Sequence, residues 1–143
     1  MYKAVPDSNV LVSAFIVKIG VPNQIVRQSG ALFILCSCKE ILRESERILR
    51  SDRIRRKYRF TDDELLEYVE GLQNSGIVEM VSNLPEVTIM QEDPTDNVII
   101  ACAQKAAAPF IVTGDQHLLQ LKMYGSIRIV TLREFLTLLS SQS

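Results

Sequence analysis

Short apolar runs alternate along the chain with longer segments in which apolar residues recur at helical spacing. The short runs predict strands, and the run ALFILC is apolar throughout, which is typical of a strand buried on both faces. The predicted strands are residues 2–5, 31–36, 110–113 and 127–130, with a weaker strand at 77–81. The predicted helices are residues 23–30, 37–49, 61–72, 93–107 and 131–139.

Helix-start signals support this division. Ser37 and Glu40 have the spacing of a capping box, in which a hydroxyl and a carboxylate satisfy free amides of the first turn. Asp93 followed by Pro94 has the form of a cap with proline at the first helical position. Buried strands that alternate with helices predict βαβ units, a mostly parallel sheet and helices on both faces. We therefore expect one α/β domain over residues 1–143.

Composition places the chain among ordinary globular proteins. Of its 143 residues 47% are hydrophobic and 23% are charged, and its cysteines (Cys36, Cys38 and Cys102) are too few for a disulfide framework and wrongly spaced for a zinc site. No apolar stretch approaches the ~18 residues that a membrane-spanning helix needs, and the first residues show no basic-then-apolar leader. These features predict a cytoplasmic protein with no membrane partner.

The net charge of −1 conceals two oppositely charged segments. Residues 43–59 carry eight Lys or Arg against three acids, whereas residues 61–96 carry ten acids and no base. The basic segment has two interpretations, a patch that binds phosphate groups or the solvated face of a helix. The charge pattern alone does not decide between them.

Three aspartates stand where a parallel sheet would bring them to one edge. Asp7 follows the first predicted strand, Asp115 follows a later one, and Asp96 lies in the first turn of a predicted helix. Ligands of such sheets bind outside the carboxyl ends of the strands. Helix capping would explain each aspartate singly, but three from distant segments indicate one acidic crevice.

An acidic crevice of this kind predicts a site for a divalent cation. Crowded carboxylates repel one another, and their pKa values rise unless a cation is present. Mg²⁺ prefers oxygen ligands, and a metal so held lowers the pKa of bound water and stabilises displacement at phosphorus. A fourth carboxylate would come from Glu44 or Glu46, and helical geometry does not choose between them. The single histidine, His117, is expected to lie on the surface of a helix.

Five segments of the sequence resemble the PIN-domain family, in its bacterial and archaeal branch of toxins from type II toxin–antitoxin pairs. They are residues 7–14 (DSNVLVSA), 40–49 (EILRESERIL), 93–97 (DPTDN), 112–115 (VTGD) and 129–136 (IVTLREFL). Their order and spacing match the family over nearly the whole chain. The resemblance implies a Rossmann-like three-layer α/β/α sandwich and an endoribonuclease that uses Mg²⁺ or Mn²⁺ to cleave single-stranded RNA.

The resemblance also implies roles for single residues. The metal-binding and catalytic acids would be Asp7, Glu44, Asp96 and Asp115. Glu44 is thereby selected over Glu46, while Asn9 and Thr113 match polar positions that support such a site. The phosphate-binding interpretation of the basic segment gains weight in this setting, and its candidate contacts with the RNA backbone are Arg47, Arg50, Arg53, Arg55, Arg56 and Lys57. The implied partners are a cognate antitoxin and a second copy in a homodimer.

Two positions depart from the family pattern. Pro6 lacks the backbone donor that a central strand uses, so we expect strand pairing to end at Val5 or a bulge to redirect Asp7. Gln116 and His117 replace a frequent extra acid, which predicts a site that holds one metal firmly and a second only with substrate. The departures leave an alternative, a catalytically weak or inactive PIN-like module that binds RNA or a partner. Phosphoacceptor receivers and Asp-x-Asp phosphatases are disfavoured because they need a second acid after the first strand.

Overall fold

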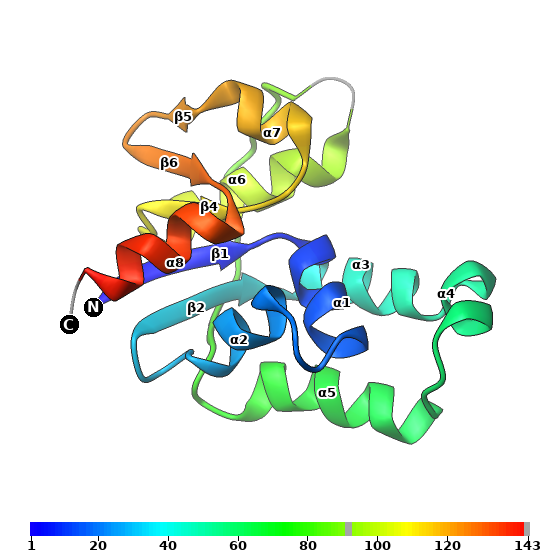
Figure 1. Ribbon diagram of the computed structural model, residues 1–143. Helices are drawn as coiled ribbons and strands as arrows, with labels where there is room; N and C mark the ends of the chain where they lie inside the picture. Colours follow the sequence, from blue (N-terminus) through cyan, green and yellow to red (C-terminus); the bar gives the residue numbers. More distant parts are fainter. Residues whose placement is uncertain (91–92, 142–143) are drawn as a thin grey trace.

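The computed structural model describes residues 1–90 and 93–141, and within them a six-stranded sheet has the order β3-β2-β1-β4-β6-β5 (Figure 1). The strands are β1 (Tyr2–Pro6), β2 (Phe33–Cys38), β3 (Glu79–Val81), β4 (Phe110–Val112), β5 (Met123–Tyr124) and β6 (Ile127–Val130). Neighbouring strands pair in parallel except β5, which pairs antiparallel with β6. The expected mostly parallel sheet is confirmed, and β1 lies inside it between β2 and β4.

Helices cover both faces of this sheet (Figure 1). They are α1 (Ser8–Ile16), α2 (Val21–Arg27), α3 (Lys39–Leu49), α4 (Asp52–Lys57), α5 (Asp62–Asn74), α6 (Pro94–Ala106), α7 (Gln116–Leu121) and α8 (Leu132–Ser140). On one face α2 packs against α8, and the Phe135 ring of α8 contacts the rings of Phe33 and Phe110. On the other face α6 packs against β1, β2, β3 and β4. This layering is the predicted α/β/α sandwich.

The hydrophobic pattern does not indicate α1. Six of its nine residues are buried, so apolar residues surround the helix and mask its period. The elements α4, α7 and β5 span six residues or fewer and are too short for a periodic signal. No single helix among the described residues is long and apolar enough to cross a membrane. By length and composition, α1 and α2 pass that test only as a pair bent by 101°.

The helix predicted to begin at Ser37 begins two residues later. β2 continues to Cys38 because Cys36, Ser37 and Cys38 pair with β3. Cys38 is then the N-cap of α3 without a side-chain capping bond, so the capping box expected for Ser37 and Glu40 is wrong. The Ser37 hydroxyl is buried with no hydrogen-bond partner among the described residues. Pairing with a strand distant in sequence decides this boundary.

Pro6 stays in the sheet, so the expectation that pairing ends at Val5 or that a bulge intervenes is wrong. Pro6 lies opposite Val112 of β4, and the backbone N–H of Asp7 donates to the Val112 carbonyl at 3.0 Å. Successive backbone donors face opposite sides of a parallel strand, so position 6 faces β2. The pairing of β1 with β2 ends at Ala4. Pro6 therefore removes no hydrogen bond from the pairing of β1 with β4. Asp7 follows β1 directly, at the edge of the sheet.

Candidate metal centre

Asp7 joins the end of β1 to the start of α1. It is 2% exposed, and its Oδ1 accepts a hydrogen bond from the backbone N–H of Val10 at 2.9 Å, which makes it the N-cap of α1. Its Oδ2 accepts a hydrogen bond from the hydroxyl of Thr113. Both carboxylate oxygens are held, so the orientation of Asp7 is fixed from two sides.

Thr113 ties the two strand ends of the site together. It follows β4 and is fully buried, and its Oγ1 donates to Asp7 while accepting from the backbone N–H of Asp115 at 2.9 Å. Asp115 is the N-cap of α7, and its Oδ1 accepts from the N–H groups of His117 at 2.7 Å and Leu118 at 3.3 Å. Asp7 and Asp115 thus each cap a helix and also lie together at the site, joined through Thr113.

Asp96 is the acid of the site whose buried carboxylate is least stabilised by hydrogen bonds. It lies in the first turn of α6, is 4% exposed, and its Oδ2 is buried with no hydrogen-bond partner among the described residues. Burial, and then the charges of Asp115, Asp93 and Asp7, raise the pKa of Asp96 from 3.8 to about 6. The charge of His117 acts in the opposite direction. A buried carboxylate oxygen without a hydrogen bond is costly, and a cation bound at this position would offset that cost.

The acids around Asp96 fit a divalent cation. One carboxylate oxygen from each of Asp93, Asp96 and Asp115, here called the acidic cluster, lies within 4.8 Å of the other two. Burial is the main cause that raises the pKa of Asp7, and the charge of Asp115 adds to it against the hydrogen bonds of the Asp7 carboxylate. Hard oxygen donors held close together are the donor set that Mg²⁺ and Mn²⁺ bind.

Sequence reasoning gave Asp93 a capping role and did not expect it among these acids. Asp93 is indeed the N-cap of α6, with its side chain accepting from the N–H of Thr95 at 3.0 Å. It also belongs to the acidic cluster. The signal in the sequence is its spacing of three residues from Asp96, which brings two carboxylates to one helix turn.

Glu44, like Asp7, is not one of the three acids of the acidic cluster. It is half-buried on α3, and its Oε2 and Oε1 accept hydrogen bonds from Nε (3.0 Å) and Nη2 (2.5 Å) of Arg47. Its metal-binding role stays a prediction.

Asn9 and His117 stand beside the site. Asn9 is exposed on α1, and its backbone N–H bonds to Asp7 and lowers the pKa of that carboxyl against the effect of burial. His117 is on α7 with its side chain 60% exposed, and its Nδ1 lies 3.8 Å from Oδ1 of Asp115. His117 is thus on the surface of a helix, as expected.

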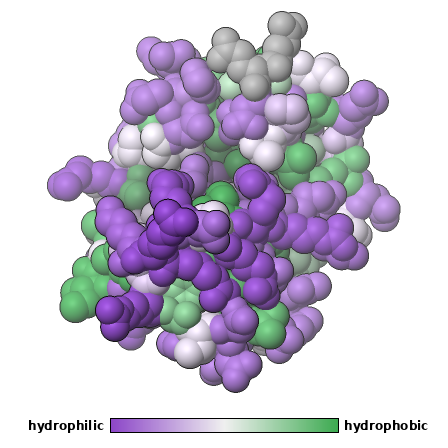
Figure 2. Space-filling model, turned by 90° about the vertical axis from the view of Figure 1, so that its right-hand side faces the viewer, coloured by the Kyte–Doolittle hydropathy of each residue, from purple (hydrophilic) through white to green (hydrophobic). Residues whose placement is uncertain are grey.

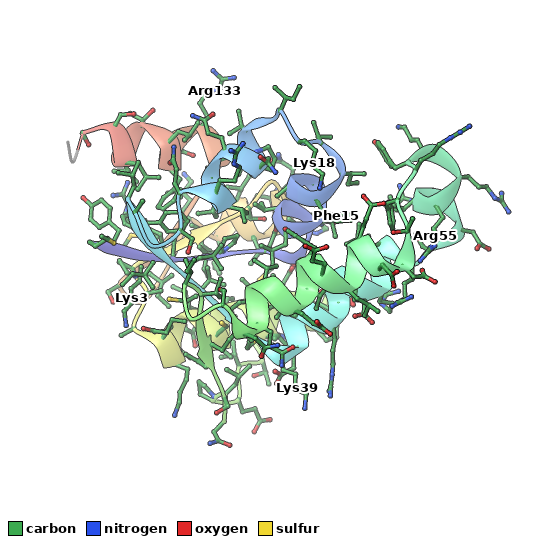
Figure 3. The ribbon with its side chains drawn as sticks, turned by 90° about the horizontal axis from the view of Figure 1, so that it is seen from below. Lys3, Phe15, Lys18, Lys39, Arg55 and Arg133 are labelled. Atoms are coloured by element: carbon green, nitrogen blue, oxygen red, sulfur yellow. The ribbon has the colours of Figure 1, made fainter. Side chains whose placement is uncertain are left out.

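The basic segment forms a strongly hydrophilic end of the molecule around α4 (Figure 2). Part of its charge is already paired. Arg50 lies 3.3 Å from Glu46 and 3.6 Å from Asp62, and Arg55 forms a closer ion pair with the same Asp62. Arg55 accordingly lies next to α5 (Figure 3). Through Asp62, the pair with Arg55 joins α4 to the start of α5, and the pair with Arg50 joins the C-terminal end of α3 to it.

The remaining basic side chains of α4 face solvent. Arg53 and Arg56 are exposed and make no ion pair with a described residue, and the Nζ of exposed Lys57 lies 5.6 Å from the ring centre of Tyr58. Some residues of the basic segment therefore form ion pairs within the chain, and phosphate binding by the others stays a prediction.

Replacing Thr113 with valine is expected to lower the free energy of unfolding by about 2–3 kcal/mol, because valine leaves a buried carboxylate oxygen and a backbone N–H without their hydrogen bonds. Urea denaturation in EDTA measures the change. Thr113→Ser keeps the hydroxyl and should lose less. A larger loss in Thr113→Ser than in Thr113→Val would contradict this, because it would show that the methyl group, which only valine retains, contributes more than the hydroxyl.

The structure is an α/β/α sandwich with a mostly parallel sheet, and the acids at the carboxyl edge of that sheet are a donor set that could hold a metal ion. The family model described as PIN domain matches residues 3–117, and the chain belongs to the PIN-domain family. A solved structure that is similar is that of VapBC2 from Rickettsia felis bound to a DNA fragment from their promoter. The match has a TM-score of 0.62 at 10% identity and covers 90% of this chain and 98% of that chain. At this identity the likeness concerns the fold. No curated protein matches the chain.

Proposed function

We propose that this protein is a metal-dependent endoribonuclease, one domain spanning residues 1–143, that cleaves single-stranded RNA with a metal-activated water. The observation that carries the proposal is Asp96, a buried residue in a cluster of acids whose Oδ2 has no hydrogen-bond partner among the described residues. Membership of the PIN-domain family supports nuclease chemistry at this edge of the sheet.

The catalytic acids of this proposal hold Mg²⁺ or Mn²⁺ and are Asp7, Glu44, Asp96 and Asp115. When bound, the cation lowers the pKa of a water ligand and neutralises the charge that develops at the scissile phosphate. Thr113 positions Asp7 and Asp115 through the two hydrogen bonds of its hydroxyl, and Asn9 supports Asp7 through its backbone N–H. The burial of Asp96 raises its affinity for a cation, because water does not solvate the carboxylate in its place.

The RNA backbone would bind along the basic segment. Arg53 and Arg56 carry no ion pair with the described residues and are available without a competing acid. The other proposed contacts are Arg47, Arg50, Arg55 and Lys57. Each phosphate that they neutralise releases counterions, so RNA affinity should fall with rising salt concentration.

The proposed setting is a type II toxin–antitoxin pair in the cytoplasm, with this chain as the toxin. The likeness in fold to a chain of VapBC2 supports a cognate antitoxin as partner. A homodimer is the second proposed assembly, in which the basic segment and the acidic helix α5 of two copies would meet. Asp62 and Glu64 at the start of α5 are already bonded within their own chain, so Glu67 and Glu70, further along the helix, would make such contacts.

A binding module without turnover is the second candidate, and one observation favours it. Glu44 is engaged by Arg47 instead of joining the acidic cluster, which leaves the family's set of four acids incomplete. Such a module would show salt-dependent affinity for RNA and no metal-dependent cleavage.

End-labelled single-stranded RNA incubated with the protein in Mg²⁺ or Mn²⁺ tests the function. We expect cleavage that EDTA abolishes, with 5′-phosphate and 3′-hydroxyl product ends, because a metal-activated water attacks the phosphorus. Products with 2′,3′-cyclic phosphate, or cleavage that persists in EDTA, would contradict the mechanism. RNA binding by folded protein without any cleavage would favour the binding module.

A further inference from the structure

Asp93 and Asp96 lie three residues apart at the start of α6. Pro94 occupies the first helical position between them, where its restricted backbone suits the helix. Residues at this spacing share one side of a helix, and their carboxylates approach Asp115 at the start of α7. Both helices begin at the carboxyl ends of the strands (Figure 1). Three acids thus meet at this edge of the sheet.

The hydrogen bonds of Asp93 leave one of its oxygens available. The N–H and the hydroxyl of Thr95 both donate to Oδ1, and no described residue donates to Oδ2. Asp115 uses its oxygens in the same way, since its Oδ1 accepts the hydrogen bonds from the backbone N–H groups of His117 and Leu118. Asp7 differs, because both of its oxygens accept hydrogen bonds. In Asp93 and Asp115 one oxygen can therefore cap a helix while the other binds a ligand.

Asp96 is an independent sign that a ligand belongs between these carboxylates. Its Oδ2 is buried without a hydrogen-bond partner among the described residues, although the residue is only 4% exposed. One oxygen each of Asp93, Asp96 and Asp115 lies within 4.8 Å of the other two. Carboxylates this close repel one another, and a cation bound between them would offset the repulsion because it attracts each of them.

We propose that Asp93 is a ligand of the cation in addition to the N-cap of α6, and that it binds the cation together with Asp96 and Asp115, the other acids of the acidic cluster. The inference rests on the proposed metal-dependent function. It adds to that function a ligand that neither the family resemblance nor the capping pattern assigns.

Metal binding itself is the test. Asp93→Asn and Asp93→Ser both remove the carboxylate and keep a capping oxygen, since Asn, Asp and Ser cap helices about equally well. Asp63→Asn, exposed in the first turn of α5, is the matched control for the loss of one charge at a helix start. Mn²⁺ affinity is measured from the electron paramagnetic resonance of the free ion. Luminescence lifetimes in H₂O and D₂O count the waters on bound Eu³⁺.

Both Asp93 variants are expected to weaken Mn²⁺ binding by about 10-fold or more and to add about one water to bound Eu³⁺. Their melting temperatures in EDTA should be no lower than that of the wild type, because the cap is retained. Asp63→Asn should match the wild type in affinity and in water count.

The outcomes separate the two proposals. Wild-type protein that binds no Mn²⁺ would overturn the proposed metal dependence itself. Wild-type binding with unchanged affinity and water count in the Asp93 variants would overturn the ligand role of Asp93 and leave the proposed function standing. Weaker Mn²⁺ binding without an added water would also overturn it, because Asp93 would then act only through its charge.

Discussion

Asparagine in place of Asp96 is expected to lower metal-dependent RNA cleavage by about 100-fold or more, because the neutral amide is a poorer ligand for a hard cation than the carboxylate. The substitution keeps the size of the side chain. Initial rates of cleavage of end-labelled RNA in Mn²⁺ measure the effect. Asp63→Asn, exposed on α5, controls for the charge change and should cleave at the wild-type rate.

The Asp96→Asn protein is expected to fold at least as stably as the wild type when metal is absent. In the wild type the buried carboxylate lacks a hydrogen-bond partner among the described residues and is repelled by neighbouring acids. Loss of cleavage with an undiminished melting temperature in EDTA would therefore locate the defect in the site. Full cleavage by the folded variant would remove Asp96 from the catalytic acids.

The stability of the metal-free protein is expected to depend on pH through Asp96. Its pKa is raised from 3.8 to about 6, so the folded protein keeps this proton where the unfolded chain has released it. The stability that the proton contributes is fully present below about pH 4 and is lost as the pH rises through about 6. A shift of about two pKa units makes this loss on the order of 2–3 kcal/mol.

Urea denaturation in EDTA between about pH 4.5 and pH 8 tests this dependence when wild type and Asp96→Asn are compared. The raised pKa of Asp7 gives a dependence of the same sign in both proteins, so their difference isolates Asp96. The wild type should lose stability relative to the variant as the pH rises. Saturating Mn²⁺ should reduce the loss, since a cation stabilises the charged form. Parallel curves in EDTA would contradict the raised pKa of Asp96.

Local pattern predicts most elements of this fold and fails where distant pairing intervenes. The cap at Asp93 is confirmed because capping depends on neighbouring residues alone. Ser37 was misassigned because pairing with β3 carries the strand past it. The effect of Pro6 was misjudged because the side of the strand that its missing donor faces depends on the order of the sheet.

The sequence by itself determined the α/β class, the parallel sheet and the presence of aspartates just after its strands, because each of these follows from residues close together in the chain. Only the tertiary structure decided which acids meet. It brings Asp115 to Asp93 and Asp96, and it buries Oδ2 of Asp96 without a hydrogen-bond partner among the described residues. Asp115 is distant in sequence from the other two acids, and the cluster follows from α6 and α7 both beginning at one edge of the sheet.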